Sequence, residues 1–308
     1  MKKLLFILIV ALGISSCDDE VDIPLKDTTP FLNVDAWLTN TGDTQQIVLN
    51  YTRPYFDNGA PEPALAAEVM VVDIETLASF VFSDEDDDGI YVWVPAPGEV
   101  FGEVGHSYGL QISVDGQVYQ SFSTLNAAPS VDSITFEYNK KDAFIEEDYY
   151  YAEFWARDFE GPGNTYWVKS FVNDTYLGKP EQINIAYDAG FSAGGEVDSL
   201  IFIQPIRTAI TPFPTETPAV SPFKRGDKLR VELHAIPIDA WFFLYRVQDE
   251  TVRQPGFAQL FANPLANSPT NIVPTSDDVS VVGFFSVAGV SSLEVVMSDE
   301  NIVDRVPD

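Results

Sequence analysis

Hydrophobic residues in this chain recur at every second position in short segments, and this alternation restricts the fold more than any other feature. In the first segment the apolar positions are Leu32, Val34, Ala36 and Leu38. A period of two is typical of β-strands with one buried face, whereas an amphipathic helix repeats every 3.6 residues. Further segments of this kind lie near 47–51, 69–71, 91–93 and 108–114. The sequence therefore predicts an all-β fold.

The strand pattern divides the chain into two β-rich parts. Asp115-Gly116 suits the left-handed turn of a two-residue hairpin, and the number of strands before residue 124 favours a sandwich. We therefore predict an immunoglobulin-like or transthyretin-like β-sandwich over residues 30–128, ending in a linker at 126–129. A second β-rich domain is predicted over residues 129–308.

The second part has a less regular pattern. It contains strand patterns near 131–138, 149–157, 165–173, 228–235 and 283–297. Prolines at five positions between 205 and 223 predict an extended surface loop there. One short helix is predicted at 238–252, because Trp241, Leu244 and Tyr245 would share a face.

The N-terminus has the pattern of an export signal. Lys2 and Lys3 precede the unbroken apolar run 4–12, which is too short to span a bilayer. Small residues and then Cys17 follow, as in the lipobox of bacterial lipoprotein precursors. Residues 1–16 are therefore predicted to be a signal peptide, and residues 17–29 an acidic tether whose Cys17 sulfur carries the lipid, with acyl chains such as palmitate. The alternative is a plain secretory signal with an incidental cysteine.

Charge and cysteine content exclude several classes of protein. The chain has 47 acidic and 17 basic residues and a net charge of −30, which argues against a nucleic-acid partner. Its single cysteine rules out an internal disulfide. With only two histidines and no further cysteine, an ordinary zinc site of nitrogen and sulfur ligands cannot be assembled.

Several short segments, taken in their order along the chain, resemble the Bacteroidota lipoproteins grouped as domain of unknown function 4249. They are the motif at Cys17 and the segments 67–73, 105–110, 157–158, 163–167, 223–227, 271–272 and 283–285. The resemblance covers nearly all of the chain beyond the signal peptide. The chain departs from many members of that family because it lacks cysteines in its later part.

The resemblance implies a location and a partner but no reaction. In such lipoproteins acidic residues directly after the lipidated cysteine resemble the signal for export to the outer face of the outer membrane. Asp18, Asp19 and Glu20 would form that signal here. The charge run alone also fits a solvated tether. The implied partner is a TonB-dependent outer-membrane receptor, and no catalytic residue is carried over.

An acidic run resembles part of a calcium-binding loop. Asp84, Asp86, Asp88 and Gly89 occupy positions 1, 3, 5 and 6 of such a loop, but position 12 is Pro95 instead of glutamate. The other interpretation is a solvated tip between two strands. Apart from calcium at this run and the covalent lipid, no cofactor is predicted.

An aromatic strand offers a second candidate site. Tyr149, Tyr151 and Trp155 alternate onto one face, which would be an exposed platform for a glycan or a peptide, or would pack against another part of the protein. The opposite face, which includes Tyr150 and Phe154, is predicted to be core.

Candidate catalytic motifs are weak. Residues 190–194 match G-x-S-x-G around Ser192, but no helical pattern follows, and His234, downstream of it, lies in a strand pattern. We therefore expect a non-enzymatic accessory or substrate-capture protein of the outer membrane. The alternatives are a surface hydrolase acting on glycans or peptides, and a structural component of envelope assembly.

Overall fold

The computed structural model describes residues 29–54, 57–140, 148–193, 198–213, 220–253, 268–276 and 279–304. Cys17 and the acidic residues Asp18, Asp19 and Glu20 lie outside these ranges. Strands predominate and helices are few, which confirms the all-β class. No helix in the described ranges is long and apolar enough to cross a bilayer.

The described residues of the first half of the chain form eight strands. They are β1 (Leu32–Thr39), β2 (Gln45–Tyr51), β3 (Glu62–Pro63), β4 (Glu68–Asp73), β5 (Ser79–Phe82), β6 (Ile90–Trp93), β7 (Ser107–Val114) and β8 (Gln117–Thr124). Between β7 and β8, Asp115 and Gly116 both have positive φ, 51° and 74°. These angles are those of the type I′ turn that matches the twist of a hairpin.

The second half supplies the other described elements. The strands are β9 (Val131–Asn139), β10 (Tyr149–Ala156), β11 (Thr165–Val172), β12 (Thr175–Tyr176), β13 (Asn184–Tyr187), β14 (Lys228–Ala235), β15 (Val273–Pro274), β16 (Val281–Val296) and β17 (Ile302–Asp304). The helices are α2 (Gln204–Thr208), α3 (Ile238–Thr251) and the 3-10 turn η1 (Pro180–Gln182).

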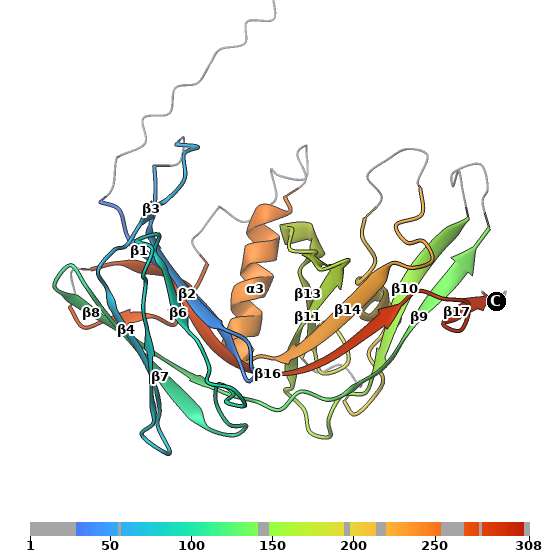
Figure 1. Cartoon of the computed structure of the whole chain (residues 1–308), viewed down its shortest axis with the longest axis horizontal. Coiled ribbons are helices and arrows are strands. Elements are labelled where there is room, and N and C mark those ends of the chain that lie inside the picture. The colour runs from blue at the N-terminus through green and yellow to red at the C-terminus, as the bar shows by residue number, and fades with distance from the viewer. Residues whose placement is uncertain are drawn as a thin grey trace, which may run out of the picture.

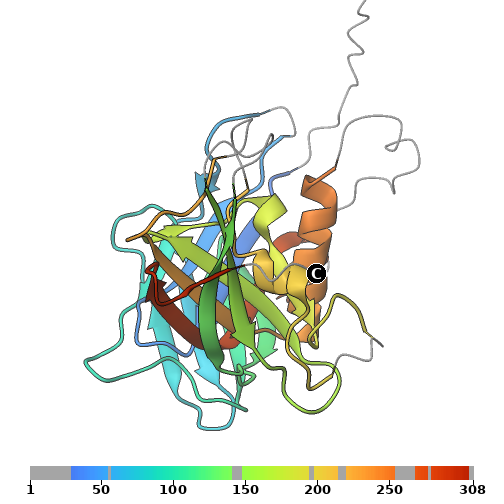
Figure 2. The ribbon, with the colours of Figure 1, turned by 90° about the vertical axis from the view of Figure 1, so that its right-hand side faces the viewer.

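One long sheet runs through the whole molecule in the order β12-β11-β14-β16-β1-β2-β3, and β13 and β6 pair with β11 and β2 (Figure 1). A sheet of order β15-β8-β7-β4-β5 packs against its first part, and a sheet of order β10-β9-β17 belongs to its second part. We call the two units the first and the second sandwich. In Figure 2, β9 and β10 lie nearest the viewer and α3 stands to one side.

β16 connects the two sandwiches. Its first eight residues pair with β1 in parallel, from Val281 opposite Leu32 to Ala288 opposite Thr39. Its remaining residues pair with β14 in the antiparallel sense. Gly289 lies at the change of partner, where its N–H donates to the carbonyl oxygen of Asn126 at 3.0 Å. The linker predicted at 126–129 therefore crosses β16 where the two sandwiches meet.

The chain does not divide into two separately packed segments at residue 128. Ile272, Val281, Phe285 and Val287 all belong to the core of the first sandwich. β15 also pairs with β8. The alternation identifies a strand and its buried face, but it does not identify the partner with which that strand forms hydrogen bonds.

The proline-rich segment 205–223 differs from the expected extended surface loop. α2 begins with a proline in its first turn, where the missing N–H has no helical partner to lose. Ile206 and Ile210 are fully buried in the core of the second sandwich. The expectation of a surface loop is therefore wrong for α2, and residues 214–219 lie outside the described ranges.

α3 occupies the range that the sequence predicts for a helix. Ala240, Trp241 and Leu244 are buried, and the side chain of Gln248 donates to the carbonyl oxygen of Ile183 at 2.9 Å. The helix stands between the two sandwiches (Figure 1). It thereby limits the space that remains open on the long sheet.

Candidate binding site

The alternation gives the long sheet one face in the two cores and one face outside them. On β1, for example, Leu32, Val34, Ala36 and Leu38 are buried. We call the other face the open face. Its side chains include Asp35, Trp37, Trp167, Lys169, Arg230, Glu232, His234 and Phe284.

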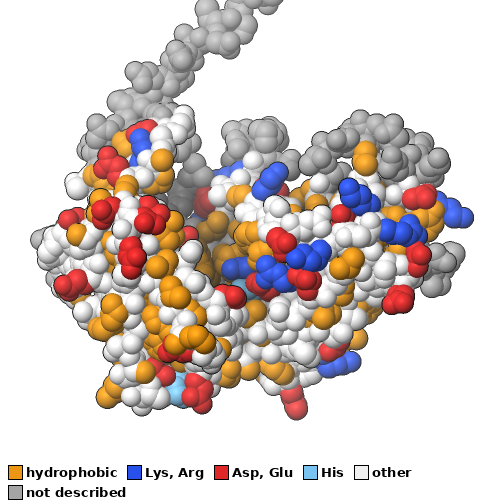
Figure 3. Space-filling model, in the orientation of Figure 1, with side chains coloured by type: hydrophobic (Ala, Val, Ile, Leu, Met, Phe, Trp, Pro, Cys, Tyr) orange, Lys and Arg blue, Asp and Glu red, His pale blue; other side chains and the backbone are white. Residues whose placement is uncertain are grey.

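The open face is concave. Trp37 of β1 and Trp167 of β11 meet edge to face with ring centroids 5.1 Å apart. Two strands lie between theirs, so a flat sheet would hold the two backbones about 14 Å apart. The sheet must therefore curl toward its open face, and Figure 3 shows the surface hollowed between the two sandwiches.

Aromatic rings form the base of this hollow. Trp37 stacks on Phe284 at 5.7 Å, and Phe243 of α3 lies 4.8 Å from Phe284. α3 therefore covers part of the open face through the apolar cluster that contains Trp241 and Leu244. What remains open is the region of Asp35, Trp37 and Lys169.

Most charged side chains on β14 are paired with one another. Arg230 forms an ion pair with Glu232, whose carboxylate also lies 3.0 Å from Nε2 of His234. Burial, together with the charges of Lys169 and Arg230, lowers the pKa of His234 well below its usual value. The imidazole is therefore neutral near pH 7, and its Nε2–H donates to Glu232.

Lys169 differs from the other described basic side chains. Its Nζ lies 4.0 Å from the ring centroid of Trp167, and no carboxylate of the described residues forms an ion pair with it. Burial lowers the pKa of Lys169 to about 8, and the charge of Asp35 partly opposes that shift. Lys140, Arg157, Lys179 and Lys224 also have no ion pair in the described part of the chain, but all four are exposed.

Asp35 faces the same hollow. Its side chain is exposed to solvent, yet burial by surrounding protein raises its pKa, while Lys169 and Trp37 act in the opposite direction. Exposure combined with desolvation is expected of a group inside a concavity. A pocket of 290 Å³ adjoins it, lined by Asp35, Trp37, Thr39, Thr41, Asp43, Thr44, Gln45, Gln46 and Val48.

The acidic run predicted as a calcium loop forms the connection between β5 and β6. The carboxylate of Asp84 accepts from the backbone N–H groups of Asp88 and Gly89, at 3.3 and 2.9 Å. Asp88 accepts from the N–H of Ile90 at 2.8 Å, and Asp86 is exposed. Two of the three aspartates therefore stabilise the turn itself.

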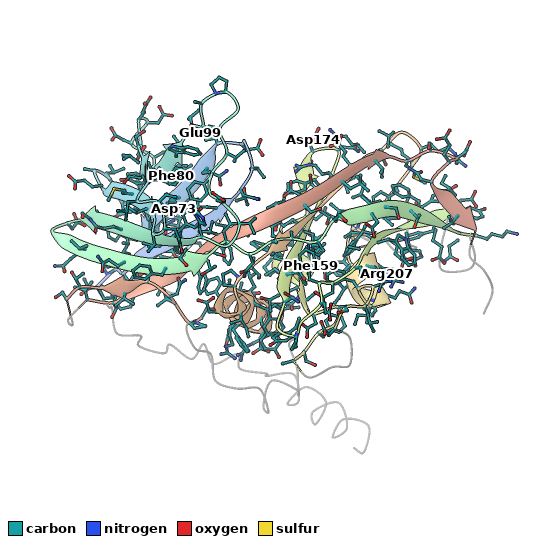
Figure 4. The ribbon with its side chains drawn as sticks, turned by 90° about the horizontal axis from the view of Figure 1, so that it is seen from below. Asp73, Phe80, Glu99, Phe159, Asp174 and Arg207 are labelled. Atoms are coloured by element: carbon teal, nitrogen blue, oxygen red, sulfur yellow. The ribbon has the colours of Figure 1, made fainter. Side chains whose placement is uncertain are left out.

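Among the described residues, one group of side chains is spaced as metal ligands would be. It consists of Asp73, Glu75 and His106, whose ligand atoms lie within 4.8 Å of one another. Asp73 lies in the first sandwich (Figure 4). It accepts from the N–H groups of Glu75 and Thr76 at 2.9 Å and lies 2.8 Å from Nδ1 of His106.

These hydrogen bonds give the group a structural role. Burial tends to raise the pKa of Asp73, but the bonds from His106, Thr76 and Glu75 outweigh it and hold the pKa at about 2. This group is not among the sites predicted from the sequence. The available signal was that Asp73 and His106 both fall in segments of the family resemblance.

The predicted aromatic platform is not exposed as a unit. Tyr149 is buried, with 2% of its surface exposed, whereas Tyr151 is exposed and Trp155 is half-buried. Arg207 of α2 lies over the ring of Trp155 at 4.3 Å and donates to the carboxylate of Glu153 at 2.7 Å (Figure 4). The sequence did not reveal that α2 covers this strand, because the segment that contains α2 was predicted to be a loop. The opposite face lies in the core, as predicted.

Ser192 of the G-x-S-x-G match is exposed in the turn that follows β13, and the last glycine of the motif lies outside the described residues. The next helix in the described ranges, α2, begins only at Gln204, so no described helix starts directly after this turn. His234 is 4% exposed and is held by Glu232. The two side chains therefore do not stand in the strand-turn-helix context that a nucleophile elbow requires.

A family model described as Domain of unknown function (DUF4249) matches residues 18–294, which is most of the chain. No curated protein matches the chain.

Proposed function

Since this chain belongs to the family described as Domain of unknown function (DUF4249), we propose that it is a lipoprotein of the Bacteroidota outer membrane, exposed on the cell surface. It acts there as a non-enzymatic partner that captures a ligand for a TonB-dependent receptor. The lipobox motif ending at Cys17 and the acidic residues after it support the location.

The hollow between the two sandwiches carries the proposal. Its aromatic base is rigid because Trp37 packs against Trp167, Phe284 and Phe243. Asp35 and Lys169 face this hollow, and neither has an ion-pair partner among the described residues. Preformed concave sites with a few charged groups are typical of ligand binding.

The described catalytic candidates support binding over hydrolysis. Glu232 forms an ion pair with Arg230 and accepts from His234, so neither Glu232 nor His234 is free to act as a base without breaking that network. Ser192 stands in an exposed turn. A capture function needs none of these groups to change its protonation state.

The membrane anchor is tested by metabolic labelling with palmitate in cells that express the wild type or Cys17→Ser. We expect label in the wild type and none in Cys17→Ser, and proteinase K added to intact cells should digest the wild type. A third variant, Asp18→Asn with Asp19→Asn and Glu20→Gln, should keep the label and become resistant to the protease. An unlabelled wild type would overturn the anchor.

The receptor is tested by purifying the tagged wild type from gently solubilised outer membrane and identifying the co-purifying proteins by mass spectrometry. A β-barrel receptor of the TonB-dependent class is expected, and its absence would contradict the accessory role. Turnover of a glycan or peptide that disappears in Glu232→Gln would support the hydrolase instead. A growth defect independent of nutrient supply would support envelope assembly.

A further inference from the structure

We propose that the hollow binds a short peptide with free termini, whose carboxylate reaches Lys169 and whose amino group reaches Asp35. This inference deepens the capture function proposed above and rests on it. It depends on two opposite charges that face one concavity without touching.

The isolation of Lys169 indicates that it receives an anion from outside the chain. With 47 acidic and 17 basic residues, carboxylates are abundant. Lys228, Arg230 and Arg207 each have a carboxylate within ion-pair distance. Lys169 instead lies over Trp167 on the curled sheet. Its ammonium is partly withdrawn from water, so a ligand carboxylate would find little competition from solvent.

Asp35 offers the complementary charge. No lysine, arginine or histidine of the described residues forms an ion pair with it, and Lys169 acts on it only at longer range. Asp43 lines the same pocket, beside Thr39, Thr41 and Gln45. A ligand ammonium would therefore meet two carboxylates and several hydroxyl and amide oxygens.

Trp37 joins the two binding points. It lines the pocket with Asp35, and its ring contacts Trp167, which lies beneath Lys169. A ligand that spans the two charges would therefore pass over indole rings, which favour the apolar backbone and small side chains of a peptide. The pocket volume of 290 Å³ suits the amino-terminal part of a peptide a few residues long.

A sugar acid fits these observations less well. Its carboxylate would satisfy Lys169, but it would bring no cation to Asp35 and Asp43. Opposite charges on the two sides of the hollow match a zwitterion. Peptide termini carry those charges near pH 7.

Isothermal titration of the purified soluble protein, residues 18–308, with tri-alanine, its N-acetylated form and its C-terminal amide tests the proposal. Tri-alanine should bind, and blocking either end should weaken binding about tenfold or more, because each end contributes a charge-assisted hydrogen bond. Binding that is equal for all three peptides, or absent for all three, would overturn the inference.

Single substitutions test which residue binds which end of the peptide. In Lys169→Met the free acid and the amide should bind equally, while the N-acetyl effect remains. In Asp35→Asn the N-acetyl effect should shrink while the amide effect remains. Lys224→Met and Asp86→Asn remove exposed charges elsewhere and should leave both effects unchanged. A full amide effect in Lys169→Met, in a variant whose cooperative urea unfolding shows that it is folded, would contradict the assignment.

The receptor experiment separates the two proposals. If the receptor co-purifies but tri-alanine does not bind, the peptide inference fails and the accessory role stands. If tri-alanine binds with the expected end preferences but no receptor co-purifies, the accessory role fails alone.

Discussion

Trp37 and Trp167 touch edge to face at 5.1 Å, although the strands that carry them are separated by β14 and β16. This contact is possible only because the long sheet curls strongly. It also places Lys169 and Asp35 close enough for each to affect the pKa of the other. The hollow that we propose as a binding site therefore depends on an aromatic contact between the two sandwiches.

Removing the Trp37 ring should weaken both the fold and the hollow. Trp37→Ala loses the contacts with Trp167, Phe284 and Phe243, and we expect it to lower the free energy of unfolding by about 3 kcal/mol. Urea unfolding measures the change. Phe242→Ala, at a ring that is half exposed on α3, should cost much less, and equal losses for the two variants would contradict the role of Trp37.

Two glycines of β16 should not tolerate alanine. At Gly283, φ is 95° and an added Cβ would lie 2.0 Å from the carbonyl oxygen of Val34; at Gly289 it would lie 2.3 Å from that of Asn126. Because these obstacles are backbone atoms, each substitution should cost about 2 kcal/mol or more in urea unfolding. Gly42→Ala meets only an ordinary contact at 3.7 Å and should change stability by less than about 0.5 kcal/mol.

Lys169 should oppose folding near neutral pH. Burial holds its folded pKa at about 8, whereas the unfolded side chain has a pKa of 10.5. Between these values the unfolded chain binds more protons, so the free energy of unfolding rises with pH. We expect Lys169→Met to stabilise the protein by about 1 to 3 kcal/mol near pH 7 and by less near pH 10.5. A gain that is the same at both pH values would show that the ammonium is not desolvated.

The pair of His106 and Asp73 should stabilise the first sandwich within a limited pH range. Hydrogen bonding to Asp73 raises the pKa of His106 above 6.5, so its contribution is present below that pH and lost as pH rises through the raised pKa. The pKa of Asp73 is lowered to about 2, so its contribution is lost only as pH falls from 3.8 toward that value.

Urea unfolding of wild type and His106→Asn tests this pair. The variant should lose more stability near pH 5.5 than near pH 9, because the imidazolium is present only at the lower pH. Taking the difference between the two proteins removes the effect of His234, whose lowered pKa acts in the opposite direction. A loss that does not depend on pH would contradict the charged pair.

Arg207 should be needed to hold the strand predicted as an aromatic platform. Arg207→Ala leaves the buried carboxylate of Glu153 without its partner and uncovers Trp155, so we expect a loss of about 3 kcal/mol. Adding Glu153→Gln should recover part of that loss, since an amide is less costly to bury than a carboxylate. Additive losses in the double variant would show that the two side chains do not interact.

Several segments of the family resemblance have structural roles that become apparent only from hydrogen bonds. The carboxylate of Asp227, in the turn Arg225-Gly226-Asp227, accepts from the N–H of Lys224 at 2.9 Å. The side chain of Asn271 exchanges two hydrogen bonds with the backbone of Phe285. These residues lie in segments of the family resemblance, which indicates that part of the family pattern encodes turns and strand connections.

The sequence by itself determined where most strands lie and which face of each is buried, because alternation of polar and apolar residues is a local property. It also supplied the export motif, which needs no folded context. Only the tertiary structure decided that β16 would pair with β1 and join the two sandwiches. The N–H of Val290 bonds to the side chain of Asn40, 250 positions away, and no local pattern specifies such a pairing. The hollow depends on the same long-range pairing, because the curl of one continuous sheet brings Trp37 to Trp167 and Asp35 toward Lys169.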